Sequence, residues 1–512
     1  MADYQTIVIG SGAGGLSSAL YLSKNEYSVL LLEAMPSFGG YLNPFSRKSY
    51  EFDIGLHDMG ELGKGQRFWS LLDNLGIADK MRFIELDPDG FYRYVFGDYE
   101  FRLCKEKHRF KERLLQAFPQ ESRGISKFLK VLDKITRAVE EATLMSGGPV
   151  GMIKFLLKNP VMLKYSRAPY QKLLDEVTSD RTLQAVLTGH CCLYGLPPQR
   201  ASIIAAMEVL NHFLTGAYYP HGGSNTFRDV FLDALRNHGA KMKNKARVVR
   251  INKKGKEFSV ETESGESFTT KAVISNADPV VTLGKLADPR IVPSKIRKKV
   301  ERLRPSLGGF YAFIGTDLDL PSLGITDGTI LHYEAFDVNR IYEIMTASRF
   351  QETVPFCFIT SPSVKDPQGE HAPQGRHTIE LITYINYSVF EKWRNAPSMK
   401  RGEEYNLLKE KIGKQLIKTA ERYIPNLSEH LDHVEYASPL SNEHWVNAVK
   451  GGVFGPEQTP DQIGPGRFSS TTAGIEGLFL VGAATLGAGI MTCVASGVLA
   501  GQKAANLLVS KS

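Results

Sequence analysis

The first 33 residues carry two short apolar runs on either side of an amphipathic segment. Residues 5–9 and 28–32 are rich in β-branched and leucine side chains, which predicts two buried strands. Between them, residues 16–22 place apolar side chains at helical spacing. This order of strand, helix and strand predicts a βαβ unit at the start of the chain.

Hydrophobic spacing divides the middle of the chain into a helical and a mixed part. Residues 68–214 are predicted to be rich in helices, because segments such as 68–75 and 125–135 have amphipathic spacing. Apolar runs at 308–315 and 378–385 predict strands of a further sheet. We expect this sheet to form the floor of a substrate cavity.

The C-terminal region contains an uncharged stretch, residues 477–501, that is long enough to span a bilayer. Six of these residues are glycines, and the run from Gly482 to Gly489 would break a single helix. We therefore predict a strand, a loop and a buried helix instead of a transmembrane segment.

Residues 152–165 form a short apolar stretch that also contains several lysines. It follows a basic region, since residues 102–167 hold 15 Lys and Arg against 6 Asp and Glu. One interpretation places the stretch in a membrane interface, with its lysines at the lipid headgroups. The other is a core-facing helix pair with solvated lysines, and the sequence leaves both open.

Composition limits the class of protein. A chain of 512 residues exceeds what one core usually covers, so we expect two domains. A net charge of +7 is mild for this length and does not indicate nucleic-acid binding. Five cysteines without a CxxC pair favour a reducing compartment. Because the first strand is predicted near residue 5, we expect no signal peptide and therefore a cytoplasmic protein. If residues 152–165 do contact a membrane, the protein would lie on the inner face of that membrane.

A glycine-rich loop connects the first predicted strand to the first predicted helix. Gly10 permits a tight turn, Gly12 lets the backbone approach a pyrophosphate at the helix N-terminus, and Gly15 lets helix and strand pack closely. Glu33 ends the second strand, where a carboxylate can accept hydrogen bonds from an adenosine ribose. Together these features predict a dinucleotide site.

Two groups of potential metal ligands are weak. His190, Cys191 and Cys192 lie in an apolar stretch without further ligands at metal spacing. His430 and His433 lack the glutamate and third ligand that zinc hydrolases need. We therefore expect no metal site.

Further motifs match a known family. The chain contains Gly39-Gly40, then Phe52-Asp53-x-Gly55-x-His57-x-x-Gly60, and later Gly216-Ala-Tyr-Tyr219-Pro-x-Gly222-Gly-Ser224. The first two resemble the FAD-binding amine-oxidase-like superfamily, and within it the group of phytoene desaturases, carotenoid isomerases and retinol saturases. The third resembles the retinol saturases most. Tyr41 and His221 depart from residues that members of these families often carry at these positions. Many flavoproteins have Asp at the position of Ala483, whereas several carotenoid enzymes of the group have Ala.

The resemblance implies an α/β protein with a Rossmann-type FAD-binding domain, like those of glutathione reductase and the amine oxidases, and an α+β substrate domain. It implies a discontinuous FAD-binding domain (1–67, 215–290 and 441–512), a helical part that faces substrate or membrane (68–214) and an α+β cavity part (291–440). The residues expected to bind FAD are Gly10, Ser11, Gly12, Ala13, Gly14, Gly15, Glu33, Ala34, Gly39, Gly40, Tyr41, Gly55, Leu56, His57, Val248, Asn276, Ala277, Gly482, Ala483, Gly489, Ile490 and Met491.

The implied function is an FAD-dependent oxidoreductase that acts on carbon–carbon double bonds of a long apolar polyene or isoprenoid, with saturation favoured over desaturation. His57, Tyr219 and His221 are candidate proton donors or positioning groups. A separate reductase, quinone or diffusible carrier is expected to exchange electrons, because we see no second strand-GxGxxG-helix unit. Two alternatives are a redox-neutral carotenoid isomerase and a non-catalytic lipid escort of the Rab GDP-dissociation inhibitor type. No polar cluster in the sequence indicates a charged substrate.

Overall fold

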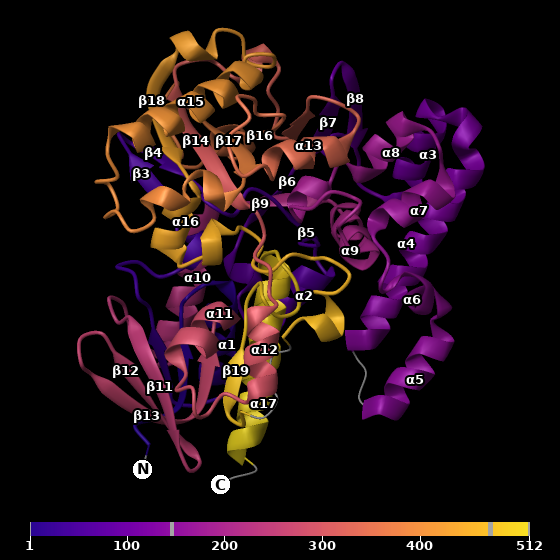
Figure 1. Cartoon of the computed structure of the whole chain (residues 1–512). Helices are drawn as coiled ribbons and strands as arrows, with labels where there is room; N and C mark the ends of the chain where they lie inside the picture. Colours follow the sequence, from indigo (N-terminus) through magenta and orange to yellow (C-terminus); the bar gives the residue numbers. More distant parts are fainter. Residues whose placement is uncertain (1, 144–147, 469–474, 510–512) are drawn as a thin grey trace.

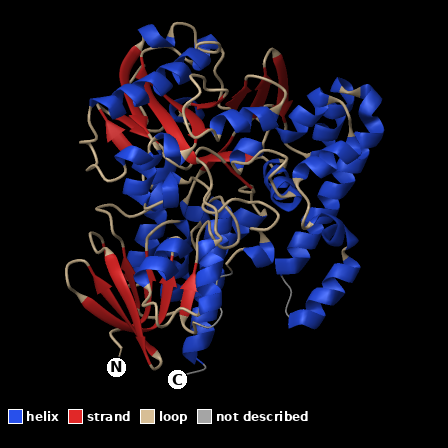
Figure 2. Ribbon diagram, viewed as in Figure 1, coloured by secondary structure: helices blue, strands red, loops and turns tan. Residues whose placement is uncertain are grey.

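The structure is a computed structural model that describes residues 2–143, 148–468 and 475–509. Two large sheets lie one above the other at the left of Figure 1, and most helices of the segment before residue 214 gather at the right. Figure 2 shows that strands dominate the left side and helices the right.

The first sheet has seven strands, and its parallel part follows from the predicted βαβ unit. Strands β10, β2, β1, β13 and β19 pair in parallel, and β12 and β11 extend β13 as an antiparallel hairpin. The bounds are β1 Tyr4–Ile9, β2 Val29–Leu32, β10 Lys241–Lys243, β11 Val248–Lys254, β12 Glu257–Thr262, β13 Ser267–Ser275 and β19 Leu478–Leu480. The parallel strands are buried along most of their length, as expected when helices cover both faces.

Helices α1 (Ala13–Lys24) and α17 (Ile490–Val509) pack tightly against each other beside this sheet. The hydroxyl of Ser17 donates to the carbonyl of Val494 at 3.0 Å. A Cβ atom at Gly497 would lie 2.0 Å from Oγ of Ser17. The first and last helices of the chain thus lie side by side next to the first sheet. The predicted strand, loop and buried helix near the C-terminus are confirmed.

The second sheet also has seven strands, in the order β18-β14-β17-β16-β15-β7-β8. The predicted pair is confirmed, because β14 and β17 are antiparallel neighbours. The bounds are β7 Tyr92–Phe96, β8 Tyr99–Leu103, β14 Gly308–Thr316, β15 Thr329–Tyr333, β16 Phe356–Thr360, β17 His377–Ile385 and β18 Leu431–Ala437. Helices α13 (Val338–Met345), α14 (Pro362–Lys365), α15 (Glu403–Ala420) and α16 (Pro439–Val446) accompany this sheet.

The segment 68–214 is mostly helical, as predicted, although it also supplies strands β7 and β8 to the second sheet. Its helices are α2 Arg67–Asn74, α3 Lys107–Ala117, α4 Ser122–Thr143, α5 Gly148–Lys158, α6 Pro160–Tyr165, α7 Tyr170–Val177, α8 Arg181–Thr188 and α9 Ile203–Phe213. Small sheets connect this segment to the rest: β3 (Phe45–Arg47) pairs with β4 (Tyr50–Phe52), and β9 (Ala217–Pro220) lies between β5 (Met59–Gly60) and β6 (Phe83–Glu85). The remaining helices are α10 Gly223–Asn237, α11 Pro279–Val281 and α12 Ser294–Glu301.

Candidate functional site

The end of β2 and the loop after β1 are joined by hydrogen bonds to Glu33. Oε2 of Glu33 accepts from the backbone N–H of Ser11 at 2.9 Å and from its hydroxyl at 2.5 Å. The other oxygen accepts from the N–H of Met35 at 2.9 Å. The hydroxyl of Ser11 in turn accepts from the N–H of Gly39. The carboxylate predicted to bind a ribose is therefore held firmly at the edge of the glycine loop.

The glycine loop leaves no room for side chains. A Cβ at Gly15 would lie 1.9 Å from the carbonyl oxygen of Gly10. A Cβ at Gly14 would lie 2.8 Å from the backbone nitrogen of Gly482, which itself has φ of +90°. The N-cap of α1 is Gly12, whose residue type offers no side-chain cap. The first-turn N–H groups of α1 are thus available to an anion.

These features border one cavity of about 2580 Å³. All residues expected to bind FAD line it except Gly15, which lies beneath the loop, and Leu56, which is buried in the core. The volume exceeds the 300–1,000 Å³ of ordinary ligand pockets and is large enough for a dinucleotide together with a second ligand. The residues present therefore fit a dinucleotide cofactor.

The second sheet forms an aromatic wall of the same cavity. Tyr311 of β14, Phe358 of β16 and Tyr384 of β17 line it, as the predicted floor requires. The ring of His57 packs 5.3 Å from that of Phe358. The wall is thus mainly apolar, with one imidazole at its edge.

His57 is paired with a carboxylate that the sequence analysis did not identify. Its Nδ1 lies 2.9 Å from Oε2 of Glu380, whose side chain is fully buried. Oε1 of Glu380 accepts from the backbone N–H of Asp53 at 2.7 Å. Burial raises the pKa of Glu380 despite the opposing effect of His57. Glu380 is the only charged residue in the otherwise apolar run 378–385, and this pattern could have indicated it.

Tyr219 and His221 lie in a buried polar network behind His57. The hydroxyl of Tyr219 donates to Asp53, and burial raises its pKa well above the ordinary value. His221 Nδ1 lies 2.9 Å from Oδ1 of Asp366. Neither residue is among those that line the cavity. Their proposed contact with a reacting group remains a prediction, whereas His57 does face the cavity.

The C-terminal helix α17 directs its N-terminus at the cavity. It begins at Ile490, and the preceding Gly489 has φ of +99°. Gly487, Gly489 and Met491 line the cavity. This helix end offers backbone N–H groups and a positive partial charge to a bound group.

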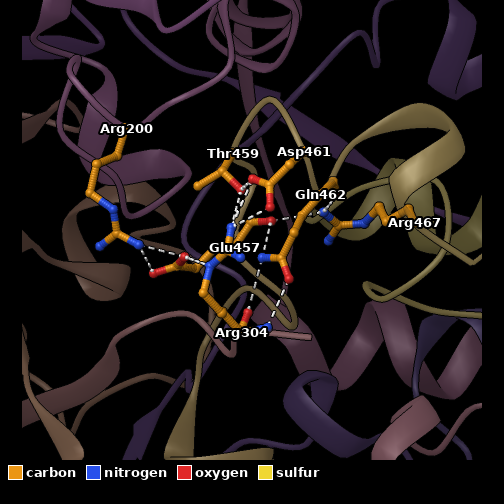
Figure 3. A network of polar contacts seen from close by, with 7 residues as sticks. All are labelled: Arg200, Arg304, Glu457, Thr459, Asp461, Gln462 and Arg467. Carbon is orange, nitrogen blue, oxygen red and sulfur yellow. Dashed lines mark hydrogen bonds and ion pairs between the residues drawn. The ribbon is translucent and has the colours of Figure 1, made fainter. Parts of the chain in front are cut away.

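A loop over residues 456–467 closes one side of the cavity and is fixed by charged side chains (Figure 3). Glu457 accepts hydrogen bonds from Nη2 of Arg200 at 2.6 and 2.7 Å and from Nε of Arg304 at 3.2 Å. Arg304 also donates to Asp461 at 2.8 and 2.9 Å. The loop residues Gln458, Pro460 and Ile463 line the cavity. The loop is thereby tied both to the helical segment and to the start of β14.

Arg467 is a buried cation beside the glycine cradle. It is 3% exposed, and Nη2 donates to the carbonyl of Ala483 at 2.7 Å. Its other hydrogen bonds go to backbone carbonyls, and in the described part of the chain no side-chain carboxylate lies within hydrogen-bond distance of it. Burial lowers its pKa to about 10. Arg467 does not line the cavity, and its hydrogen bonds fix the loop against Ala483.

The metal candidates have structural surroundings. His190, Cys191 and Cys192 are buried, and burial lowers the pKa of His190 to about 4. Within residues 2–143, 148–468 and 475–509, no group of three or more His, Cys, Asp or Glu side chains is placed to hold a metal ion. In the same ranges, no helix is long and apolar enough to cross a membrane.

Comparisons with known proteins agree with this architecture. A model of the family described as flavin containing amine oxidoreductase matches residues 13–509. An all-trans-retinol 13,14-reductase of Danio rerio is 26% identical over 477 residues, covering 89% of this chain and 78% of the relative. A chloroplastic prolycopene isomerase 1 of an Oncidium hybrid cultivar is 26% identical over 525 residues, covering 99% and 85%. The crystal structure of an oxidoreductase from Methanosarcina mazei matches with a TM-score of 0.66 and 16% identity, covering 98% of this chain and 100% of that one.

Proposed function

The chain belongs to the family of flavin containing amine oxidoreductases and uses FAD, and we propose that it saturates a carbon–carbon double bond of a long apolar polyene or isoprenoid. One observation carries the proposal: the nucleotide cradle and a largely apolar wall border the same cavity. The similarity to a retinol 13,14-reductase supports the choice of substrate class and of direction.

The apolar lining extends from the second sheet to the helical segment. Ile382 and Tyr384 line the cavity on β17, Val209 and Phe213 line it on α9, and Phe155 lines it on α5. Such a surface binds a hydrocarbon chain by the hydrophobic effect, at about 25 cal/mol per Å² buried. It also excludes water from the reacting carbons.

Reduction of a double bond requires a hydride and a proton. When bound in the cradle in its reduced form, FAD would supply the hydride. We assign delivery of the proton to the neighbouring carbon to His57, because its ring lines the cavity and its Nδ1 lies 2.9 Å from the buried carboxyl of Glu380. Nε2 is then the nitrogen left to carry the transferred proton. A separate electron donor, of the reductase or quinone class, restores the two electrons.

Tyr219 contributes to this arrangement indirectly. Its hydroxyl donates to the side chain of Asp53, whose backbone N–H donates to Glu380. His221 and Gly222 fix the neighbouring Asp366 in the same network. We propose that these residues hold the Glu380 and His57 pair in place.

A second function is favoured by the similarity to a prolycopene isomerase: isomerisation without net redox change. Saturation and isomerisation are distinguished by mixing the photoreduced, FAD-loaded protein with a polyene under anaerobic conditions. Saturation predicts that the flavin absorbance near 450 nm returns with one polyene consumed per flavin. Isomerisation predicts many polyenes converted while the flavin stays reduced. A purified protein that takes up no flavin would instead support the lipid escort.

We also propose that helices α5 and α6 contact a membrane surface from which the substrate enters. Met152, Ile153, Leu157 and Leu163 expose 44–73% of their surface. Lys154 and Lys158 lie among them, as at an anionic lipid interface. On the same helices, Met152, Phe155 and Met162 line the cavity. An apolar substrate could therefore pass from lipid to cavity along this face.

A further inference from the structure

A group of charged side chains lies in the part of the cavity formed by the helical segment. Arg67 comes from α2, Glu140 from α4, and Glu208 and His212 from α9, and all four line the cavity. Helix α4 packs on α9, and α2 also contacts α17. The cluster is unexpected in a cavity that is otherwise suited to a hydrocarbon.

The buried carboxylate of Glu61 holds two members of the cluster, Arg67 and His212, in place. Its side chain is 2% exposed, and its carboxylate accepts from Nη2 of Arg67 at 2.6 Å and from Nδ1 of His212 at 3.1 Å. Nε2 of His212 accepts from the backbone N–H of Gly60 at 2.9 Å. Because Nε2 is an acceptor, the proton that His212 donates to Glu61 is on Nδ1. Glu61 thus has both Arg67 and His212 as hydrogen-bond donors.

This arrangement is held in a conformation that few glutamates adopt. The φ of Glu61 is +61°, in the left-handed region. Its carbonyl accepts from the N–H groups of Phe68 and Trp69 at 3.1 and 3.0 Å, at the start of α2. Although burial opposes it, the hydrogen bonds from His212 and Arg67 hold the pKa of Glu61 below its ordinary value. Glu61 thus remains ionised and orients Arg67.

Glu208 is left without a strong partner. Its Oε2 lies 3.7 Å from Nη1 of Arg67, which is longer than a hydrogen bond. Its Oε1 is shielded from solvent and has no hydrogen-bond partner in the described residues. Burial raises its pKa to about 7, with Arg67 opposing. On α9 its neighbours in the cavity wall are the apolar Ile204, Ala205 and Val209. The side chain as a whole is 24% exposed and lines the cavity, so a ligand can reach the carboxylate beside Nη1 of Arg67.

We propose that Glu208 and Nη1 of Arg67 form the binding site for a hydroxyl group at one end of the polyene substrate. A hydroxyl both donates and accepts, so it can donate to Oε2 of Glu208 and accept from Nη1 of Arg67, two atoms that lie 3.7 Å apart. A carboxylate at the end of the substrate would be attracted by Arg67 but repelled by Glu61, Glu140 and Glu208. The site therefore disfavours a carboxylate end. A pure hydrocarbon would leave Glu208 unpaired. This inference rests on the proposed polyene substrate and assigns its polar end.

The position of the site suits a role in selecting the bond that reacts. Glu61 follows His57 by four residues, and a chain of that length spans at most about 14 Å. A hydroxyl held beside Arg67 therefore fixes the register of the polyene relative to His57. The site is a specificity determinant, and it does not take part in the transfer of hydride or proton.

Binding to the FAD-loaded protein tests the assignment without turnover. The ligands are all-trans-retinol and the hydrocarbon of the same skeleton that lacks the hydroxyl, followed by quenching of protein fluorescence. The wild type should bind the alcohol about tenfold or more tightly than the hydrocarbon, which corresponds to the ~1.5 kcal/mol of a hydrogen bond to an ionisable group. Glu208→Leu should remove this preference by weakening only alcohol binding. Glu208→Gln, which can still donate and accept, should retain most of it.

Flavin content and melting temperature show that each variant is folded. A preference for the alcohol that survives in Glu208→Leu would overturn the inference, and so would equal binding of both ligands by the wild type. If Glu208→Leu does not fold, the ratio of the dissociation constants for the hydrocarbon and the alcohol, measured in the wild type and in Glu208→Gln, still tests the inference. Failure of the wild type to bind either polyene would overturn the inference together with the proposed function, whereas tight but equal binding overturns the hydroxyl site alone.

Discussion

Nδ1 of His57 lies 2.9 Å from Oε2 of Glu380, an ion-pair contact without the alignment of a hydrogen bond, and both atoms are shielded from solvent. The histidine follows a glycine-rich bend near the start of the chain, whereas the glutamate is on β17 of the second sheet. The contact fixes the imidazole at the border between the nucleotide cradle and the aromatic wall. It therefore gives the proposed proton donor a defined orientation, as a carboxylate next to a catalytic histidine does in other enzymes.

We predict that Glu380→Gln lowers the rate of polyene reduction by roughly 10- to 100-fold while FAD stays bound. Glutamine keeps the shape of the side chain but cannot stabilise a protonated imidazole. The rate should also depend differently on pH from that of the wild type, which a purely structural defect would not cause. Glu435→Gln on the exposed strand β18 is the control. An unchanged pH profile in Glu380→Gln would remove the positioning role.

Glu33→Ala is expected to weaken FAD binding by about 10- to 100-fold, since hydrogen bonds to a charged group contribute roughly 1.5–3 kcal/mol. The change also leaves the N–H groups of Ser11 and Met35 without their acceptor. Titration of the apoprotein with FAD measures the dissociation constant. Glu26→Ala, before β2, should bind like the wild type. Equal affinity of Glu33→Ala and wild type would mean that the carboxylate does not contact the cofactor.

The close approach in the glycine loop gives a third prediction. Gly15→Ala places a methyl group against the carbonyl of Gly10 and must displace α1, so FAD binding should fall by roughly 10- to 100-fold. At Gly284 the nearest atom to an added Cβ is 4.0 Å away, and Gly284→Ala should have no effect. The flavin content of each variant after gel filtration measures how well it retains FAD. Full flavin content in Gly15→Ala would contradict the described packing of the loop.

Glu208 gives a prediction for the pH dependence of stability. Its folded-state pKa of about 7 is above the ordinary 4.5 of a glutamate, so the folded protein binds the proton more tightly than the unfolded chain does. Stability attributable to this group is complete below about pH 4.5 and is lost as pH rises through 7. Relative to Glu208→Gln, the wild type should lose up to about 3 kcal/mol of unfolding free energy between pH 5 and pH 8.5. Denaturant titrations of both proteins at the two pH values measure it; a constant difference would show that the carboxyl titrates normally.

For the membrane contact, Leu157→Glu combined with Leu163→Glu should reduce binding to anionic liposomes several-fold. Both side chains are more than half exposed on the face of α5 and α6. Met399 is 84% exposed on a different segment, so Met399→Glu is the matched control. Co-sedimentation with vesicles separates the variants. Equal loss in the control and the double variant would rule out a specific membrane face.

Local patterns were sufficient to predict the nucleotide half of the site. The apolar run of β1, the glycines of the loop and Glu33 are adjacent in sequence, and their geometry follows from the βαβ unit alone. For the same reason, the break in the C-terminal apolar stretch was predicted from its glycines. The structure confirms the fold class, whereas the proposed domain boundaries remain predictions.

The substrate half depends on contacts between distant residues. Glu380 meets His57 only because the register of β14, β17 and β16 places it beneath the bend that contains His57. Glu208 meets Arg67 because α2 and α9 line one cavity. In sequence, each glutamate is a lone charge in an apolar run. Such a charge indicates a buried partner but does not identify which residue it is. The local motifs instead point to Tyr219 and His221.

The central claim is that the protein adds two hydrogens across a double bond of a polyene. Its most direct test is the mass of the product after anaerobic incubation of photoreduced, FAD-loaded protein with all-trans-retinol. The account predicts a gain of two hydrogen atoms, with no such product from oxidised protein. A product of unchanged mass and altered retention would contradict saturation and assign the protein as an isomerase, with the fold and the FAD site retained.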